Sequence, residues 1–197
     1  AEWGAFVERP IPQWYWSELR EYEGRTLNSE GAIECLLPYN AHVTPYIKLK
    51  AKGGEKITIC TDDYWIGEAR SFKTEYIAKE GEQEFETPIW TNGHSVLYYV
   101  PQGVEVLELK YRESGYNSDF VGSFECDNEL FNEIYNVSAY TFLLNCREGF
   151  FDGLKRDRWI WGGDAYQSAR INSYLFYDKE IEQRTAIGLV GKSPVDT

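Results

Sequence analysis

The nine residues SGYNSDFVG, at positions 114–122, divide the chain into two parts of different character. Gly115, Asn117, Ser118 and Gly122 in this stretch are residue types that interrupt regular structure. Before the stretch, apolar residues recur with a period of about two, as in strands with one buried face. After it, they recur about every three or four residues, as on one side of a helix. We therefore predict a β-rich region followed by a helical region.

Short apolar runs separated by turn signals fill residues 27–121, for which we predict an antiparallel β-sandwich. The strand order is left open, because jelly-roll and related topologies give the same pattern. Gly53 and Gly54 are expected to form a tight hairpin turn, since glycine readily adopts the positive φ that such turns require. The apolar phase changes after Val106, which predicts a β-bulge in the last strand. The expected strands cover residues 46–49, 57–60, 74–78, 96–100 and 104–111.

The N-terminal segment, residues 1–26, is rich in aromatic residues and is expected to be an irregular linker. Pro10 and Pro12 exclude a helix across it. Trp14 and Trp16 are expected to pack against a neighbouring surface, and sugar stacking is the alternative role.

Residues 122–197 are predicted to open an all-helical domain. The first helix is expected at about 128–145, with Asp127 as its acidic N-cap. Its apolar side chains fall on one stripe and are expected to pack in a core. That stripe comprises Leu130, Ile134, Val137, Thr141 and Leu144.

Two further helices are expected after a loop. Asp164 and Gln167 form a capping-box pattern, so the second helix is predicted to begin at Asp164. Asp178 is the expected cap of the third helix, which should end near Gly191. Three helices alone would leave apolar faces uncovered, so either a larger parent molecule or an assembly is expected to supply the missing helices.

The charge balance excludes two classes of partner. The chain of 197 residues carries a formal net charge of −12. Nucleic acids and anionic membrane surfaces repel such a chain, so neither is expected as a partner. No apolar run reaches the length of a membrane span, and no signal peptide is recognisable. Because methionine is absent, residue 1 is not expected to be a translation start, and we expect a piece of a longer polypeptide.

Neither a metal nor a cofactor is expected. The four cysteines form no CxxC pair, so they are interpreted as buried free thiols. His42 and His94 are isolated from other ligand-type residues. The sequence contains no P-loop and no G-x-G-x-x-G motif.

Residues 152–164, DGLKRDRWIWGGD, concentrate charged and aromatic side chains between two predicted helices. Such a loop is typical of a polar-ligand site. Asp152, Asp157 and Asp164 could supply the two carboxyl groups that cleavage of a glycosidic bond requires. The alternative is structural: Asp164 caps a helix, Asp152 pairs with Arg156, and the two tryptophans fill a core.

The pattern Asp152-x-x-x-Arg156-Asp157-Arg158-x-x-Trp161-x-Gly-Asp164 resembles the signature of the bacterial α-L-rhamnosidases, which are inverting glycoside hydrolases. The succession of a β-sandwich, a connector and helices is similar to that family along the whole chain. The resemblance implies that residues 27–121 form an accessory β-sandwich domain. Residues 122–197 would then be the first helices of an (α/α)6 catalytic barrel, left incomplete.

The resemblance also implies roles for residues of the loop. Asp157 matches the general acid, a position where the family usually carries Glu. Asp152, Arg156 and Asp164 match positions that contact rhamnose, and Trp161 matches an aromatic wall of the sugar pocket. The general base of the family is a Glu far downstream, so we expect it beyond residue 197. The chain by itself is therefore expected to be inactive without the remainder of its parent polypeptide.

Three alternatives remain open at this point. The chain could be a non-catalytic carbohydrate-binding module that uses Trp65 and Trp90, or a structural fragment whose sandwich only supports the barrel. It could also be a hydrolase for another sugar, because Asp157 is one methylene shorter than the usual Glu. Linkage, aglycone and compartment (bacterial periplasmic, secreted or cytoplasmic) are left open. Asp62 and Asp63 are interpreted as an acidic turn, with a sugar-binding edge as the alternative.

Overall fold

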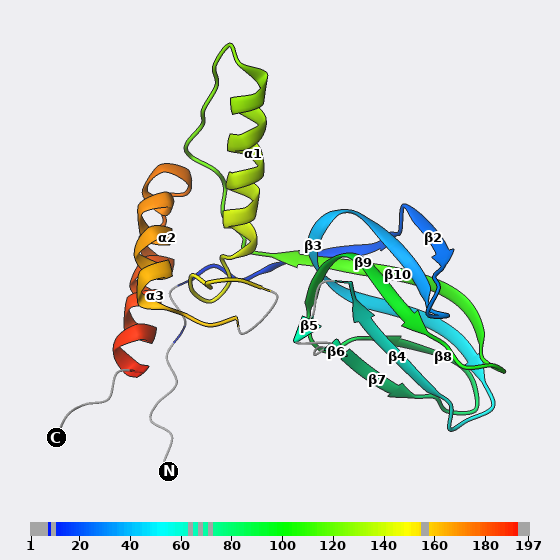
Figure 1. The fold of residues 1–197 in the computed structure, drawn as a ribbon. Helices are drawn as coiled ribbons and strands as arrows, with labels where there is room; N and C mark the ends of the chain where they lie inside the picture. Colours follow the sequence, from blue (N-terminus) through cyan, green and yellow to red (C-terminus); the bar gives the residue numbers. More distant parts are fainter. Residues whose placement is uncertain are drawn as a thin grey trace. The chain divides into compact units, whose positions relative to one another are not determined.

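The computed structural model describes residues 8, 11–62, 65–66, 69–70, 73–154 and 158–192. The chain divides into two compact units, one rich in strands and one helical (Figure 1). The sheet unit comprises Trp16–Ser114, and the helical unit comprises Ala1–Tyr15 together with Gly115–Thr197. The helical unit therefore includes residues from both ends of the chain, whereas the sequence placed the boundaries after residues 26 and 121.

The sheet unit is organised around one long strand, β3 (Ile33–Ala51). Its first half pairs with β2 and β9, and its second half pairs with β8 and β10, all antiparallel. A register irregularity between Leu36 and Ala41 marks the change. The other strands are β1 (Tyr15–Glu21), β2 (Gly24–Leu27), β4 (Lys56–Thr61), β5 (Trp65–Ile66), β6 (Ala69–Arg70), β7 (Lys73–Ile77), β8 (Gly81–Glu86), β9 (Thr91–Tyr99) and β10 (Glu105–Gly115).

The pairings give two groups of strands that share β3, in the orders β2-β3-β9-β4-β7 and β1-β10-β3-β8. Their apolar side chains meet in one core that includes residues of β3, β4, β9 and β10. Tyr98 of β9 is buried in this core, and its hydroxyl donates to the backbone oxygen of Tyr46, 3.1 Å away. It also lies 2.8 Å from the hydroxyl of Tyr22. This arrangement agrees with the predicted antiparallel sandwich.

Two expectations for the β region are wrong. Tyr15–Glu21 and Gly24–Leu27 are strands β1 and β2 rather than an irregular linker. They pair at the edges through backbone groups, which leaves little apolar pattern in the sequence. Gly53 and Gly54 do have positive φ, but β3 and β4 do not pair with each other, so the hairpin is wrong. The predicted bulge is confirmed between Val106 and Glu108.

The helical unit contains α1 (Glu129–Leu144), α2 (Gly162–Leu175) and α3 (Lys179–Lys192). The predicted cap of α3 is confirmed, since Asp178 Oδ1 accepts from the backbone N–H groups of Glu180 and Ile181. The predicted cap of α1 is wrong by one residue. Asn128 occupies that position, and its Oδ1 accepts from Leu130 N at 3.0 Å.

The apolar stripe of α1 does not pack as expected within the described part of the chain. Leu130, Ile134 and Val137 are 60%, 51% and 67% exposed. The side that is buried carries Ala139 and Phe142, which join an apolar core with residues of α2 and α3. The prediction of uncovered helix faces therefore holds for this stripe. None of the described helices is both long and apolar enough to cross a membrane.

The cysteines give a first testable prediction. Burial raises the pKa of Cys35 to about 12 and that of Cys146 well above its ordinary value, and both thiols are inaccessible. Cys126 is partly exposed. Because the thiolate is the reactive species, iodoacetamide should label Cys126 in the native protein and spare Cys35 and Cys146. Peptide mass spectrometry checks this, and labelling in guanidinium chloride is the control. Equal rates for Cys126 and Cys146 in the native state would contradict the buried position of Cys146.

Candidate functional site

The loop between α1 and α2 begins with a reverse turn, residues 145–151. Phe151 N donates to Asn145 O at 3.0 Å, and Arg147 N donates to Gly149 O at 3.2 Å. Cys146 and Phe150 face each other in an isolated β-bridge inside this turn. The turn brings the chain back beside the C-terminal end of α1, so Asp152 emerges there.

Asp152 is bonded to Trp159 at both its backbone and its side chain. Its N–H donates to Trp159 O at 3.0 Å, and its Oδ1 accepts from Trp159 N at 3.1 Å. These bonds join the two ends of the segment between Asp152 and Trp159. Arg156 and Asp157, two of the predicted site residues, lie in that segment but outside the described residues.

Asp164 lies in the first turn of α2 and is not its N-cap. The helix begins at Gly162, the cap position is Trp161, and no side chain caps it. The capping-box prediction is therefore wrong. A carboxylate in the first turn is still favoured by the partial positive charge of a helix N-terminus. Asp164 is exposed, and Trp161 leaves 49% of its surface exposed.

Asp152 and Asp164 line the same hollow, which has a volume of about 630 Å³. Asp164, Gln167 and Ser168 lie on one face of α2, because residues three and four apart on a helix are neighbours. Gln167 thus faces the hollow rather than serving in a capping box. The lining residues are Val137, Ser138, Thr141, Phe142, Asn145, Phe151, Asp152, Gly163, Asp164, Gln167, Ser168 and Ile171.

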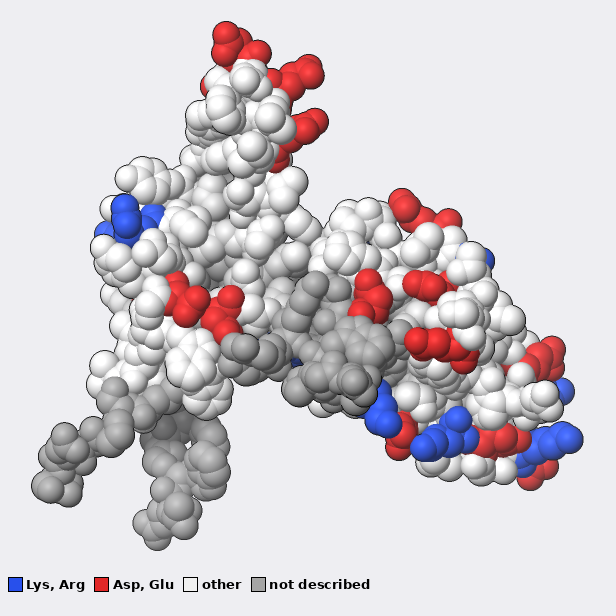
Figure 2. Space-filling model, viewed as in Figure 1, with Lys and Arg blue, Asp and Glu red and all other residues white. Residues whose placement is uncertain are grey.

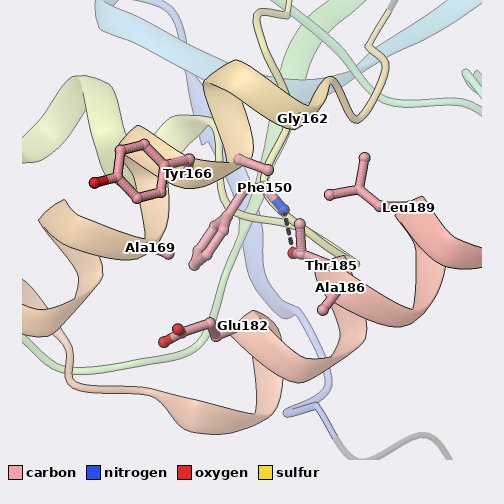
Figure 3. A pocket seen from close by; sticks show the side chains of 9 residues that line it. Phe150, Gly162, Tyr166, Ala169, Glu182, Thr185, Ala186 and Leu189 are labelled. Atoms are coloured by element: carbon pink, nitrogen blue, oxygen red, sulfur yellow. Dashed lines mark hydrogen bonds between the residues drawn. The ribbon is translucent and has the colours of Figure 1, made fainter.

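A second hollow lies between α2 and α3 (Figure 3). Its volume is about 230 Å³, and its lining is mostly apolar apart from Glu182, Thr185 and the hydroxyl group of Tyr166. Thr185 Oγ1 accepts from Phe150 N at 3.0 Å, the bond drawn as a dashed line in Figure 3. Because Phe150 precedes Asp152 by two residues, this bond holds the reverse turn from the side of α3.

Arg147 of the helical unit is fully buried, and Arg158 is partly buried. Burial lowers the pKa of Arg147 and the pKa of Arg158 to about 10 in each case, so both remain cationic at neutral pH. Arg158 has a positive φ of 49°, and its Nε donates to Leu154 O at 3.1 Å.

Exposed acidic side chains gather at the N-terminal end of α1 (Figure 2): Glu125, Asp127, Glu129 and Glu133.

The rival sites in the sheet unit receive little support. His42 is buried, and its ring lies 4.6 Å from that of Trp90, so Trp90 packs against a neighbouring ring. Asp62 Oδ1 accepts from the backbone N–H groups of His94 and Ser95, so this carboxylate is bonded to the backbone of β9. Asp63 and the side chain of Trp65 lie outside the described residues. Among the residues that the structure describes, no group of His, Cys, Asp and Glu could hold a metal ion.

The helical region matches a known family model. Residues 119–189 match the bacterial alpha-L-rhamnosidase 6 hairpin glycosidase domain. The chain is similar to the bacterial α-L-rhamnosidases. It is 24% identical over 190 residues to an alpha-L-rhamnosidase of Formosa agariphila, and the match covers 84% of this chain. The chain spans 20% of the length of that relative.

Solved rhamnosidases share the fold. The GH78 family rhamnosidase of Bacillus sp. GL1 gives a TM-score of 0.69 at 22% identity, covering 94% of this chain and 20% of that chain. A rhamnosidase from Klebsiella oxytoca with rhamnose bound gives 0.69 at 12% identity, covering 89% of this chain and 44% of that chain. The predicted class, β-structure followed by helices, is therefore confirmed.

Sequence reasoning missed several polar residues of the larger hollow, among them Asn145 of the α1 end and Gln167. Gln167 had a signal, its spacing of three residues from Asp164, but that spacing was assigned to a cap. It expected Trp14 to pack against a neighbouring surface but missed Arg147 as its partner, because their contact joins residues far apart in the chain. No local pattern predicts such a contact.

Proposed function

We propose that the protein that carries this chain hydrolyses terminal α-L-rhamnosides with inversion of configuration. The observation that supports this most directly is the shared hollow of Asp152 and Asp164, two residues of the rhamnosidase pattern. In this proposal the helical unit belongs to the (α/α)6 catalytic barrel, and residues 27–121 are an accessory domain.

The chemistry of the hollow suits a neutral, hydroxyl-rich ligand. Carboxylates such as Asp152 and Asp164 accept hydrogen bonds from sugar hydroxyls, and amides such as Gln167 can both donate and accept. The apolar face of a sugar can pack on an exposed indole, the role proposed for Trp161. Arg156 would donate to ring hydroxyls from the segment between Asp152 and Trp159.

The proposed reaction is a single displacement. Asp157 donates its proton to the glycosidic oxygen as the bond to the anomeric carbon breaks. Water attacks that carbon from the opposite face, and a second carboxylate takes a proton from the water. The two carboxyl groups of inverting enzymes lie about 6.5–9.5 Å apart, which leaves room for the water. No residue of this chain is assigned to the second carboxylate.

The test is hydrolysis of 4-nitrophenyl α-L-rhamnopyranoside by the full-length protein, followed by proton NMR. Inversion predicts that β-L-rhamnose appears first and then mutarotates to the equilibrium mixture. A panel of other aryl glycosides at equal concentration checks the sugar. Faster turnover of a different sugar would replace rhamnose in the proposal, and an initial α-anomer would refute inversion. No turnover of any glycoside would refute the hydrolase itself.

A further inference from the structure

We propose that Trp14 and Arg147 form a positioning pair that fixes the reverse turn leading to Asp152. This inference rests on the proposed function, because Asp152 is taken as a sugar-binding residue. It extends that function by making the segment before β1 a determinant of sugar affinity. Neither residue is placed in contact with the substrate.

Arg147 is the best-buried charged residue of the helical unit among those described, with 0% of its surface exposed. Its guanidinium carbon lies 3.9 Å from the ring centroid of Trp14. A cation that stacks on an indole away from water is held strongly, and tryptophan is the best aromatic partner. The guanidinium is also flat, so it can lie parallel to the ring, which an ammonium cannot do.

Trp14 contributes its ring rather than its polar group. Its Nε1 is buried and finds no hydrogen-bond partner among the described residues. A buried donor without a partner destabilises a fold, so the ring must supply the compensating contact. Ile11, three residues earlier, is buried in the same apolar core as Phe142 and Phe150. The segment that contains Ile11 and Trp14 is therefore anchored in the helical unit.

A short series of bonds connects the contact between Trp14 and Arg147 to Asp152. Arg147 lies inside the turn of residues 145–151, whose ends are joined by the bond from Phe151 N to Asn145 O. Thr185 of α3 holds the opposite side of this turn through Phe150 N. Asp152 directly follows Phe151. If the Trp14 contact is lost, the turn keeps its α3 bond but loses the support of the N-terminal segment.

The guanidinium of Arg147 stays charged at neutral pH, so the pair is a fixed support and not a pH-sensitive switch. Burial lowers the pKa of Arg147 to about 10, and the neighbouring Glu148 opposes that shift. The affinity for rhamnose should therefore show the same pH dependence in wild type and in variants of this pair.

The experiment compares Trp14→Ala, Trp14→Phe, Arg147→Lys and Arg147→Met in the full-length protein. Trp16→Ala is the matched control, since Trp16 is a half-exposed residue of the sheet unit. Two quantities are measured: KM and kcat for an aryl rhamnoside, and hydrogen exchange of the peptide covering residues 145–154. The exchange measurement is independent of activity.

For Trp14→Ala we expect KM to rise about tenfold, kcat to change less, and exchange in the peptide to quicken about tenfold. Trp14→Phe, which keeps a ring, should recover most of both, whereas Arg147→Lys should resemble Arg147→Met. Trp16→Ala should match wild type. If Trp14→Ala unfolds the helical unit, Trp14→Phe and Arg147→Lys decide the question because they keep most of the volume.

Wild-type exchange and wild-type KM in Trp14→Ala or in Arg147→Met would overturn the positioning role. Faster exchange with an unchanged KM would overturn its link to the sugar site. If the wild-type protein hydrolyses no glycoside, the proposed function fails. Hydrogen exchange alone then decides the positioning role, and unchanged exchange in Trp14→Ala and Arg147→Met would refute it.

Discussion

Replacing Asp157 by asparagine should reduce hydrolysis of an alkyl α-L-rhamnoside by the full-length protein about a thousandfold, because the amide cannot donate a proton to the leaving oxygen. The loss should be far smaller for a dinitrophenyl rhamnoside, whose leaving group departs as a stable anion without protonation. KM should change little, since the side chain keeps its size. Steady-state kinetics on the two substrates measure both effects.

Two further variants serve as controls for this prediction. Asp157→Glu keeps the acid and introduces the residue usual in the family, so it should retain substantial activity on the alkyl substrate. Asp164→Asn removes a proposed sugar contact, so it should slow both substrates by a similar factor. Near-normal turnover of the alkyl substrate by Asp157→Asn would remove Asp157 as the general acid. An equal loss on both substrates would assign it to binding instead.

The sequence predicted local features of this fold better than contacts between distant residues. Asp178 caps α3 because a side chain bonds backbone groups two and three residues away, and that distance is visible in the sequence. Gly53 and Gly54 have the expected positive φ for the same local reason. Which strands pair depends on the long strand β3, and no local pattern shows that it pairs along both of its edges.

In the candidate site, too, local features were predictable from the sequence and contacts between distant residues were not. The spacing of Asp152 and Asp164 indicated carboxylates on one loop, and the resemblance assigned them to one sugar. Their common hollow depends on how α1 and α2 pack, which periodicity does not specify. The contact between Arg147 and Trp14 could not be predicted from the sequence, for a physical reason. Arginine is usually exposed, so a fully buried one stacked on a ring from another part of the chain leaves no trace in composition.

Gly122→Ala should destabilise the helical unit by about 3 kcal/mol, at the upper end of the usual cost of overpacking. A Cβ at this position would lie 1.6 Å from the backbone oxygen of Tyr174, near the end of α2. Backbone atoms cannot rotate away as a side chain can. The shift needed would also strain the bond from Gly122 N to Leu175 O, now 3.1 Å.

Gly191→Ala is the matched control for this prediction. A Cβ there meets nothing within 4 Å, and Gly191 lies in α3, so alanine should be neutral or stabilise by up to about 1 kcal/mol. Hydrogen exchange of a peptide from α2, read in both full-length variants, separates the two outcomes. Equal protection of α2 in both would mean that the connector does not touch α2 as described. Loss of protection in Gly122→Ala alone would show that this connector, which contains the change from strand to helix, also holds α2 in place.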